Sequence, residues 1–474
     1  MTTVPPPFPP PDDPAAVLAA VVTHGYCIGC GACAVADPRI TLAETPHGLY
    51  TAVLPPRPRP AAGQVCPFAA TANEDHLAPE LFPDAPHHHP LLGRYAGLYA
   101  GAVTEGDYRA AGSSGGLVTW LVSELLRRGD IDGVIHVAPA ADQPGQFAYR
   151  LSTSVAAVRQ GAKSRYYPVQ FAQVLQGLAG RGQRFAFVGV PCFVKAVRLL
   201  ARQDPALRAA LPYCLAIFCG HLKSKAFAEM IAWQCGVPPG EPFAIDFRHK
   251  RPGAPANRYA VSVTPLAAAA APPRVVPIAK LYGLDWGLGL FKPQACDGCD
   301  DVAGELADLA AGDAWLPGYV ADPRGANVLI VRHPALLTLL SAAAAAGRLT
   351  LTALAAPEIV RSQAASFRHR REGLALRLHD ADQRGAWRPA KRIAPGTAGV
   401  SRRRAQLYRL RARLAARSHQ RYLLARRHRH FLLFPVLMAG DELRYYLWRG
   451  RWWRALPKLL LTLARAWRRG RAGR

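Results

Sequence analysis

The sequence predicts an α/β (α+β) protein from the order of its apolar segments. Short continuous apolar runs have the length of buried β-strands, and helical patterns separate them. The three clearest strand segments are residues 132–138, 184–190 and 215–219. Strands that alternate with helices indicate a sheet covered by helices around a hydrophobic core.

A glycine-rich turn and the segment after it support this prediction. The turn GSSGG at 112–116 leads into residues 117–128, where apolar side chains recur at helical spacing at Leu117, Trp120, Leu121 and Leu125. Gly129 follows two arginines and is a typical helix stop. We therefore expect an amphipathic helix with one face buried.

Two cysteines lie where predicted strands end. The strand at 184–190 runs into Pro191 and Cys192, and the strand at 215–219 ends at Cys219. Open α/β sheets bind their ligands at the carboxyl ends of strands. Both cysteines are therefore candidates for a functional site.

Length and composition narrow the class of protein. The 474 residues allow two or three domains, each with its own core. The proline-rich N-terminus lacks the basic start and apolar stretch of a secretory signal, so we expect a cytoplasmic protein whose 10 cysteines are reduced and available to metals. The most apolar late segment, FLLFPVLMAG at 431–440, is far shorter than the roughly 20 residues that span a bilayer.

Positive charge is concentrated at the C-terminal end. The formal net charge is +27, and residues 400–474 hold 21 lysines and arginines against only Asp441 and Glu442. Interspersed Leu, Tyr and Trp indicate basic amphipathic helices. We expect them to contact an anionic membrane surface or an acidic partner in preference to nucleic acid, with solvated helices that pack on the body as the plain alternative.

The first cysteine group has the spacing of a ferredoxin-type 4Fe-4S cluster. Its members are Cys27, Cys30, Cys33 and Cys66. Two residues separate the first three, and a proline follows the last, which is typical of a cubane cluster. Gly29 and Gly31 permit the tight turn between the ligands. A zinc site also accepts four thiolates, but zinc knuckles usually pair two separated C-x2-C units.

The second cysteine group is less well defined by its spacing. Its members are Cys192, Cys219, Cys296 and Cys299. A second cluster is one interpretation. The alternatives are a reactive Cys192 thiol, whose pKa a helix N-terminus lowers, and a Cys219 that belongs to the core. We expect Cys214 and Cys235 to be structural.

The GSSGG turn also has two interpretations. Free amides and the positive end of the following helix suit a phosphate, whereas small residues also form ordinary tight turns.

Seven short segments, taken in order, carry a family resemblance. They are GSSGGLVTWLV, GAKSRYY, FVGVPCFVKAV, IFCG, DFRHK, CDGCDD and LADLAAGDAW. The series resembles the coenzyme F(420) hydrogenase/dehydrogenase beta-subunit family, including its relatives that reduce 7-hydroxymethyl chlorophyll and divinyl chlorophyllide. The resemblance covers residues 27 to about 335. The FRHKRPGAPANRY segment departs from it, because the tryptophan that often follows F-R-x-K in bacterial relatives is missing.

The resemblance implies an iron-sulfur flavoprotein oxidoreductase. By resemblance, the FAD site is lined by Ser113, Ser114, Gly115, Gly116, Lys163 and Ser164, whose hydroxyls, amides and ammonium suit a pyrophosphate. The resemblance also makes the second cysteine group a second 4Fe-4S cluster. It implies no acid or base residue, and four polar motif members are either functional or structural: Asp308, Asp313, His221 and Arg248.

The expected activity is an electron relay. Single electrons would enter from a ferredoxin-like donor, pass through the two clusters and reach FAD, which would reduce a small organic substrate or a deazaflavin-type coenzyme. The rival hypothesis is a zinc-stabilised binding protein whose basic tail engages nucleic acid or an anionic membrane.

These expectations divide the chain into five segments. Residues 1–15 would be a disordered, proline-rich N-terminus, and residues 16–90 a ferredoxin-type 4Fe-4S segment that ends in an APHHHP linker. Residues 91–180 and 181–360 would be the two parts of the family core, with the flavin phosphate site in the first and the second cluster in the second. Residues 361–474 would be a basic, mostly helical extension.

Overall fold

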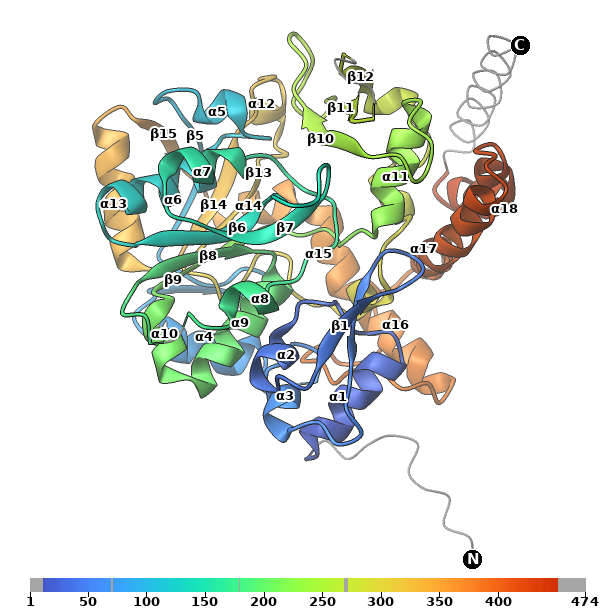
Figure 1. Cartoon of the computed structure of the whole chain (residues 1–474), viewed down its shortest axis with the longest axis horizontal. Coiled ribbons are helices and arrows are strands. Elements are labelled where there is room, and N and C mark those ends of the chain that lie inside the picture. Colours follow the sequence, from blue (N-terminus) through green and yellow to red (C-terminus); the bar gives the residue numbers. More distant parts are fainter. Residues whose placement is uncertain (1–11, 70, 179, 268–271, 451–474) are drawn as a thin grey trace, which may run out of the picture.

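The computed structural model describes residues 12–69, 71–178, 180–267 and 272–450. Helices and strands form the layered α/β arrangement that the sequence predicts (Figure 1). The predicted disorder of residues 1–15 falls mostly outside the described residues. Helix α1 (Pro14–Thr23) nevertheless begins inside the predicted disordered segment. The Asp13 side chain caps it by accepting hydrogen bonds from two amides of its first turn.

An eight-stranded mixed sheet forms the centre of the protein (Figure 1). Its strands, in spatial order, are β15 (Leu349–Ala353), β5 (Gly97–Val103), β14 (Asn327–Val331), β13 (Leu309–Asp313), β9 (Tyr213–Ile217), β8 (Phe185–Gly189), β6 (Gly133–Pro139) and β7 (Phe147–Ser152). The four strands from β13 to β6 are parallel, and the strands outside them pair antiparallel. Both predicted parts of the core, 91–180 and 181–360, thus contribute to one sheet.

The three predicted strands are present as β6, β8 and β9. Strand β9 ends at Ile217, two residues before the predicted end. The Cys219 amide donates instead to the Val302 carbonyl oxygen over 3.1 Å, in the loop before β13. Cys219 therefore lies just beyond the carboxyl end of its strand.

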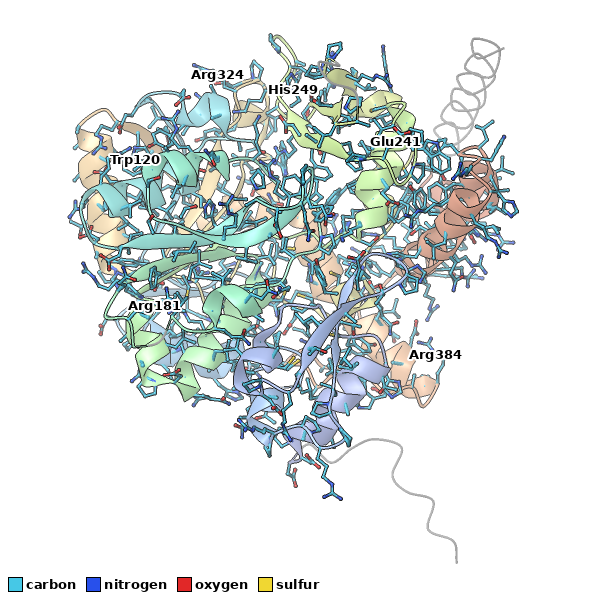
Figure 2. The ribbon with its side chains drawn as sticks, in the orientation of Figure 1. Trp120, Arg181, Glu241, His249, Arg324 and Arg384 are labelled. Atoms are coloured by element: carbon cyan, nitrogen blue, oxygen red, sulfur yellow. The ribbon has the colours of Figure 1, made fainter. Side chains whose placement is uncertain are left out.

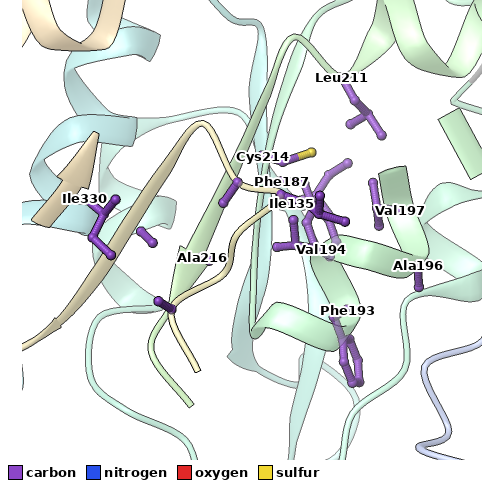
Figure 3. Close-up of a cluster of buried hydrophobic side chains, with 14 of the residues drawn as sticks. Ile135, Phe187, Phe193, Val194, Ala196, Val197, Leu211, Cys214, Ala216 and Ile330 are labelled. Atoms are coloured by element: carbon purple, nitrogen blue, oxygen red, sulfur yellow. The ribbon is translucent and has the colours of Figure 1, made fainter. Parts of the chain in front are cut away.

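Helices cover both faces of the sheet. One face carries α4 (Glu74–Leu81), α8 (Ala172–Leu175), α9 (Pro191–Gln203) and α10 (Pro205–Ala210). The other carries α5 (Tyr108–Ala111), α6 (Leu117–Arg127), α7 (Val155–Gln160) and α13 (Pro334–Ala345). Because strand side chains alternate, Phe187 of β8 packs towards α9, as Figure 3 shows, whereas Ala186 packs towards α6. Trp120 of the predicted helix α6, labelled in Figure 2, is fully buried.

The N-terminal segment packs on this core as a small unit of its own. It contains α2 (Ala32–Ala36), the hairpin of β1 (Thr41–Glu44) and β2 (Tyr50–Val53), and α3 (Pro60–Gln64). The predicted APHHHP linker is instead partly a strand, because β3 (His87–His89) pairs with β4 (Gly93–Tyr95).

The C-terminal extension completes a second hydrophobic core. This core joins α11 (Lys225–Gln234) and the sheet of β10 (Phe243–His249), β11 (Ala260–Pro265) and β12 (Arg274–Pro277) to α17 (Arg402–Arg427) and α18 (Leu433–Trp448). Leu414, Tyr422 and Phe434 are each 0% exposed there. The alternative that the helices pack on the body is therefore confirmed for α17 and α18, while the aromatic and basic stretch from residue 451 onward lies outside the described residues. Along the chain, α14 (Ala356–Ser362), α15 (Ala364–Arg370) and α16 (Glu372–Gln383) connect the main sheet to this pair.

Candidate redox site

The first cysteine group comes together around α2. Its members lie before α2, in α2 and after α3: Cys27, Cys30, Cys33 and Cys66. The Cys30 thiol interacts electrostatically with the other three, so the four are neighbours. Gly29 and Gly31 have φ values of 65° and 93°, as the predicted tight turn requires. A Cβ atom on Gly31 would lie 2.8 Å from the Ala172 Cβ, which leaves no room for a side chain.

Burial opposes the ionisation of Cys30, Cys33 and Cys66. It raises the pKa of Cys66 to about 11, and burial together with the neighbouring thiols also raises the pKa of Cys30 and Cys33. Four thiolates in this place need a compensating positive charge, which bound metal supplies. The chemistry of the group therefore fits a metal centre held by four sulfurs.

The second cysteine group lines one small cavity. All four predicted members are in its wall: Cys192, Cys219, Cys296 and Cys299. The parallel strands β8 and β9 place the first two at one edge of the sheet, because both residues follow the carboxyl ends of their strands. The other two come from the 3-10 helix η3 (Gln294–Gly298) and the residue after it. The Cys296 Sγ accepts a hydrogen bond from the Leu222 amide over 3.3 Å.

The surroundings of the Cys192 thiol oppose its ionisation. Loss of solvent raises its pKa well above the ordinary value, and the other three cysteines raise it further. This direction is opposite to the alternative in which the helix N-terminus lowers the pKa. Burial likewise raises the pKa of Cys219 to about 12 and that of Cys296 to about 11.

Within the described ranges, no group of three or more His, Cys, Asp or Glu side chains is arranged around a single metal ion.

The two remaining cysteines lie apart from both groups. Cys214 is in β9 and Cys235 follows α11, and both are buried. Cys214 packs in the core beneath α9 (Figure 3).

A larger cavity of about 860 Å³ contains most of the predicted flavin residues in its wall. Those residues are Ser113, Ser114, Gly116, Lys163 and Ser164. Gly115 lies behind the wall, where a Cβ atom would be 2.7 Å from the Gly101 carbonyl oxygen. The volume falls within the roughly 300–1,000 Å³ of ligand pockets, so the cavity has the size that a cofactor needs.

The turn before α6 has a backbone that only glycine accommodates. Gly116 caps the helix with a φ of 82°, and a Cβ atom there would lie 2.5 Å from the Tyr108 carbonyl oxygen. The Ser113 Oγ accepts a hydrogen bond from the Ser164 amide over 2.8 Å, and the Ser114 Oγ donates to a main-chain carbonyl over 2.7 Å. Both hydroxyls thus fix the turn to neighbouring segments. At the positive end of α6, the Leu117 amide donates to the Asn327 Oδ1 over 3.4 Å.

Two lysines add positive charge at this turn. Lys163 lines the cavity and pairs with Asp246 over 3.1 Å. Lys250 lies behind the turn and donates to the Ser114 carbonyl oxygen over 2.9 Å. Sequence reasoning gave Lys250 no role, although it ends the DFRHK motif. Nothing in the local sequence shows that β10 brings this residue back to a turn more than a hundred residues earlier.

Another part of the wall combines aromatic rings with a buried lysine. Trp286 stacks on His221 with ring centroids 4.4 Å apart, and the Lys223 Nζ lies 4.7 Å from the centre of the Trp286 ring. All three residues line the larger cavity. Trp286 and Lys223 were missed because they lie on separate loops and share no motif.

The remaining polar motif members fall into two classes. Arg248 and Asp313 line the larger cavity and form an ion pair of 2.6 Å. Asp308 instead pairs with Arg198 over 2.7 Å and accepts a hydrogen bond from the Cys214 amide over 2.6 Å. Asp308 is therefore structural, whereas the other two can contact a ligand.

The two cavities share part of their walls. Cys219 and Ile28 line both of them, and Cys27 lines the larger one. Cys30 is also close enough to Cys192 for the two thiols to interact. Both cysteine groups therefore lie next to each other and next to the flavin-sized cavity.

No helix in the described part of the chain is long and apolar enough to span a bilayer.

Comparisons with known proteins identify the family of this chain. Two family models of the coenzyme F(420) hydrogenase/dehydrogenase beta subunit match in succession, the N-terminal one over residues 98–176 and the C-terminal one over residues 182–357. Among solved structures, the chain is similar to a chain of the F(420)-reducing nickel-iron hydrogenase complex from Methanosarcina barkeri, with 18% identity and a TM-score of 0.46, covering 60% of this chain and 92% of that one. A search of curated proteins finds no match. The matched models span more than half of the sequence, and the chain therefore belongs to the coenzyme F(420) hydrogenase/dehydrogenase beta-subunit family of oxidoreductases.

Proposed function

We propose that this chain is an iron-sulfur flavoprotein that holds two 4Fe-4S clusters and FAD. The first cysteine group would hold one cluster, the second group the other, and the larger cavity the flavin. When bound, the clusters carry single electrons and FAD combines them for two-electron chemistry. A ferredoxin-like protein is the proposed donor, and a small organic molecule or a deazaflavin-type coenzyme is the proposed substrate.

One observation carries this proposal: Cys219 lies in the walls of both cavities. A cluster ligand in the wall of the flavin cavity leaves no protein layer between the two proposed cofactors. A zinc-stabilised binding protein has no need of such a shared wall or of a cavity of about 860 Å³ beside its thiols. The arrangement therefore favours an electron relay over the rival hypothesis.

The residues of the cavity have distinct proposed tasks. The N-terminal end of α6 and Lys163 would bind the diphosphate of FAD, because amides and an ammonium group complement its charge. Ser113 and Ser164 hold the turn in place through their hydrogen bond. Trp286 would exclude water from the flavin ring with its aromatic face.

A pair of cysteine variants tests the second cluster. Cys192→Ser removes a proposed ligand, whereas Cys214→Ser alters a buried cysteine outside both groups. The proposal expects the first variant to lose about four iron and four sulfide per chain and the second to lose none. Equal iron contents in the two variants would contradict it.

We also propose that the outer face of α18 contacts an anionic membrane surface. Val436, Leu443 and Leu447 are 53%, 43% and 54% exposed, and their spacing places them on one face of the helix. Arg444 is exposed next to Leu443, whereas Arg449 pairs with Asp285 over 3.3 Å. Exposed apolar side chains beside an exposed arginine suit a lipid interface with negative headgroups.

Vesicle binding tests this surface on the full chain. The double variant Leu443→Ser, Leu447→Ser is compared with Val275→Ser, which changes an apolar side chain that is 47% exposed on β12. We expect the double variant alone to lose affinity for vesicles that contain phosphatidylserine. Unchanged binding of the double variant, or no preference of the wild type for these vesicles over phosphatidylcholine, contradicts the proposal.

A further inference from the structure

Arg370 reaches the second cysteine group from outside the part of the chain that the family models match. It is the last residue of α15, and the matches end at residue 357. Its side chain is 1% exposed and lies in the wall of the small cavity that the four cysteines line. A guanidinium is always charged at physiological pH, so a fixed positive charge faces this cavity.

Main-chain carbonyl groups hold this guanidinium in place. Its Nη2 donates to the carbonyl oxygens of Gly220 over 2.8 Å and Cys219 over 3.2 Å, and its Nη1 lies 3.5 Å from the carbonyl oxygen of Cys296. Its Nε is buried and has no hydrogen-bond partner. The arginine thus contacts the backbone of two proposed ligands, and its Nε–H stays unused.

The strongest charge interactions of Arg370 are with thiols. They involve all four members of the group: Cys299, Cys219, Cys296 and Cys192. A buried N–H that lacks a partner costs free energy, and a sulfide or thiolate in the cavity would satisfy it. Both the charge and the unused donor therefore fit an anionic group inside the ring of cysteines.

We infer that Arg370 is a positioning residue that raises the reduction potential of the cluster held by the second cysteine group. The inference rests on the proposed function. Reduction by one electron from the donor adds one negative charge to the cluster and changes no bond. A buried cation stabilises the reduced form more than the oxidised form, and hydrogen bonds to sulfur act in the same direction. Arg370 would therefore make the second cluster a better electron acceptor.

The test compares three variants of the full chain, purified without oxygen. Arg370→Gln and Arg370→Met remove the charge. Arg332→Gln is the matched control, because Arg332 is also 1% exposed, also donates to two main-chain carbonyls and also has an unpartnered Nε, but does not line the cysteine cavity. Iron and sulfide contents show whether both clusters are present. Redox titration followed by electron paramagnetic resonance then gives the midpoint potential of each.

The expected result is a shift in the midpoint potential of only one of the two clusters. Loss of the Arg370 charge should lower the equilibrium constant for reduction of the second cluster by about tenfold, a shift of about 59 mV to more negative potential for a one-electron couple. The midpoint potential of the first cluster should stay the same, and Arg332→Gln should change the potential of neither cluster.

Three other results would overturn the inference. The first is an unchanged potential in Arg370 variants that retain normal iron and sulfide. The second is an equal shift in Arg332→Gln. The third is loss of the second cluster from both Arg370 variants but not from Arg332→Gln, which would make Arg370 a residue for assembly instead. Absence of iron and sulfide from the wild type would count against the proposed function itself.

Discussion

The Lys250 Nζ donates a hydrogen bond of 2.9 Å to the Ser114 carbonyl oxygen and so ties β10 to the turn that begins α6. The ammonium is surrounded mainly by like charge. Burial and then nearby cations lower its pKa to about 8, and one carboxylate opposes them; these groups are Lys163, Arg109, Arg248 and Asp313. An ammonium held among like charges is well suited to gain an anionic partner.

We predict that FAD binding weakens above about pH 8. The ordinary pKa of 10.5 is lowered in the folded protein, so Lys250 costs stability below about pH 8 and the cost fades as pH rises to 10.5. A bound diphosphate would favour the charged form, and its affinity should therefore fall as Lys250 loses its proton. If the diphosphate restores one unit of pKa, the dissociation constant rises about fivefold between pH 7 and 9, towards a limit of about tenfold at higher pH.

Fluorescence titration of the apo-protein with FAD at the two pH values measures this effect. Lys250→Gln should bind more weakly at pH 7 and show little change with pH. Arg128→Gln, at the other end of α6, should behave as the wild type. The same pH dependence in Lys250→Gln would show that another group is responsible.

We predict that Gly116→Ala abolishes flavin binding. The new Cβ would lie 2.5 Å from the Tyr108 carbonyl oxygen, so the turn has to move. Gly129→Ala is the control, since Gly129 also has a positive φ, of 70°, but nothing lies within 4 Å of its added Cβ. The control should lose only about 1–2 kcal/mol of stability from backbone strain. Flavin content and thermal unfolding of the two variants separate the clash from the strain, and normal flavin content in Gly116→Ala would contradict the assignment.

We predict that α18 is an integral part of the fold. Phe434 is 0% exposed in the second core, so Phe434→Ala should lower the free energy of unfolding by about 3–5 kcal/mol. Val436 lies on the same helix and is 53% exposed, so Val436→Ala should change it by no more than about 0.5 kcal/mol. Denaturant unfolding compares the two. Similar small effects would mean that α18 contributes little to stability.

The sequence predicts those parts of the molecule whose signals are local. The C-x2-C-x2-C run, the GSSGG turn, helix α6 and strands β6, β8 and β9 are examples, because spacing and periodicity act over a few residues. Strand ends also place Cys192 and Cys219 at one edge of the sheet.

The remaining parts depend on contacts between distant segments. The antiparallel half of the sheet joins β5 to β14 and β15, which lie more than two hundred residues later. Contacts between distant segments also bring Lys250, Trp286 and Arg370 to the site. No local motif in the sequence predicts these contacts. In the C-terminal helices, the arginine-rich composition predicts an exposed surface. Apolar side chains between the arginines, such as Tyr422, nevertheless belong to the second core.

The measurement that tests the central claim most directly is the cofactor content of the wild-type protein. Iron, acid-labile sulfide, zinc and released flavin are quantified on one sample purified without oxygen. The account predicts about eight iron, about eight sulfide and about one FAD per chain, as two cubane clusters and one flavin require. Zinc without sulfide or flavin, even after reconstitution, would contradict it.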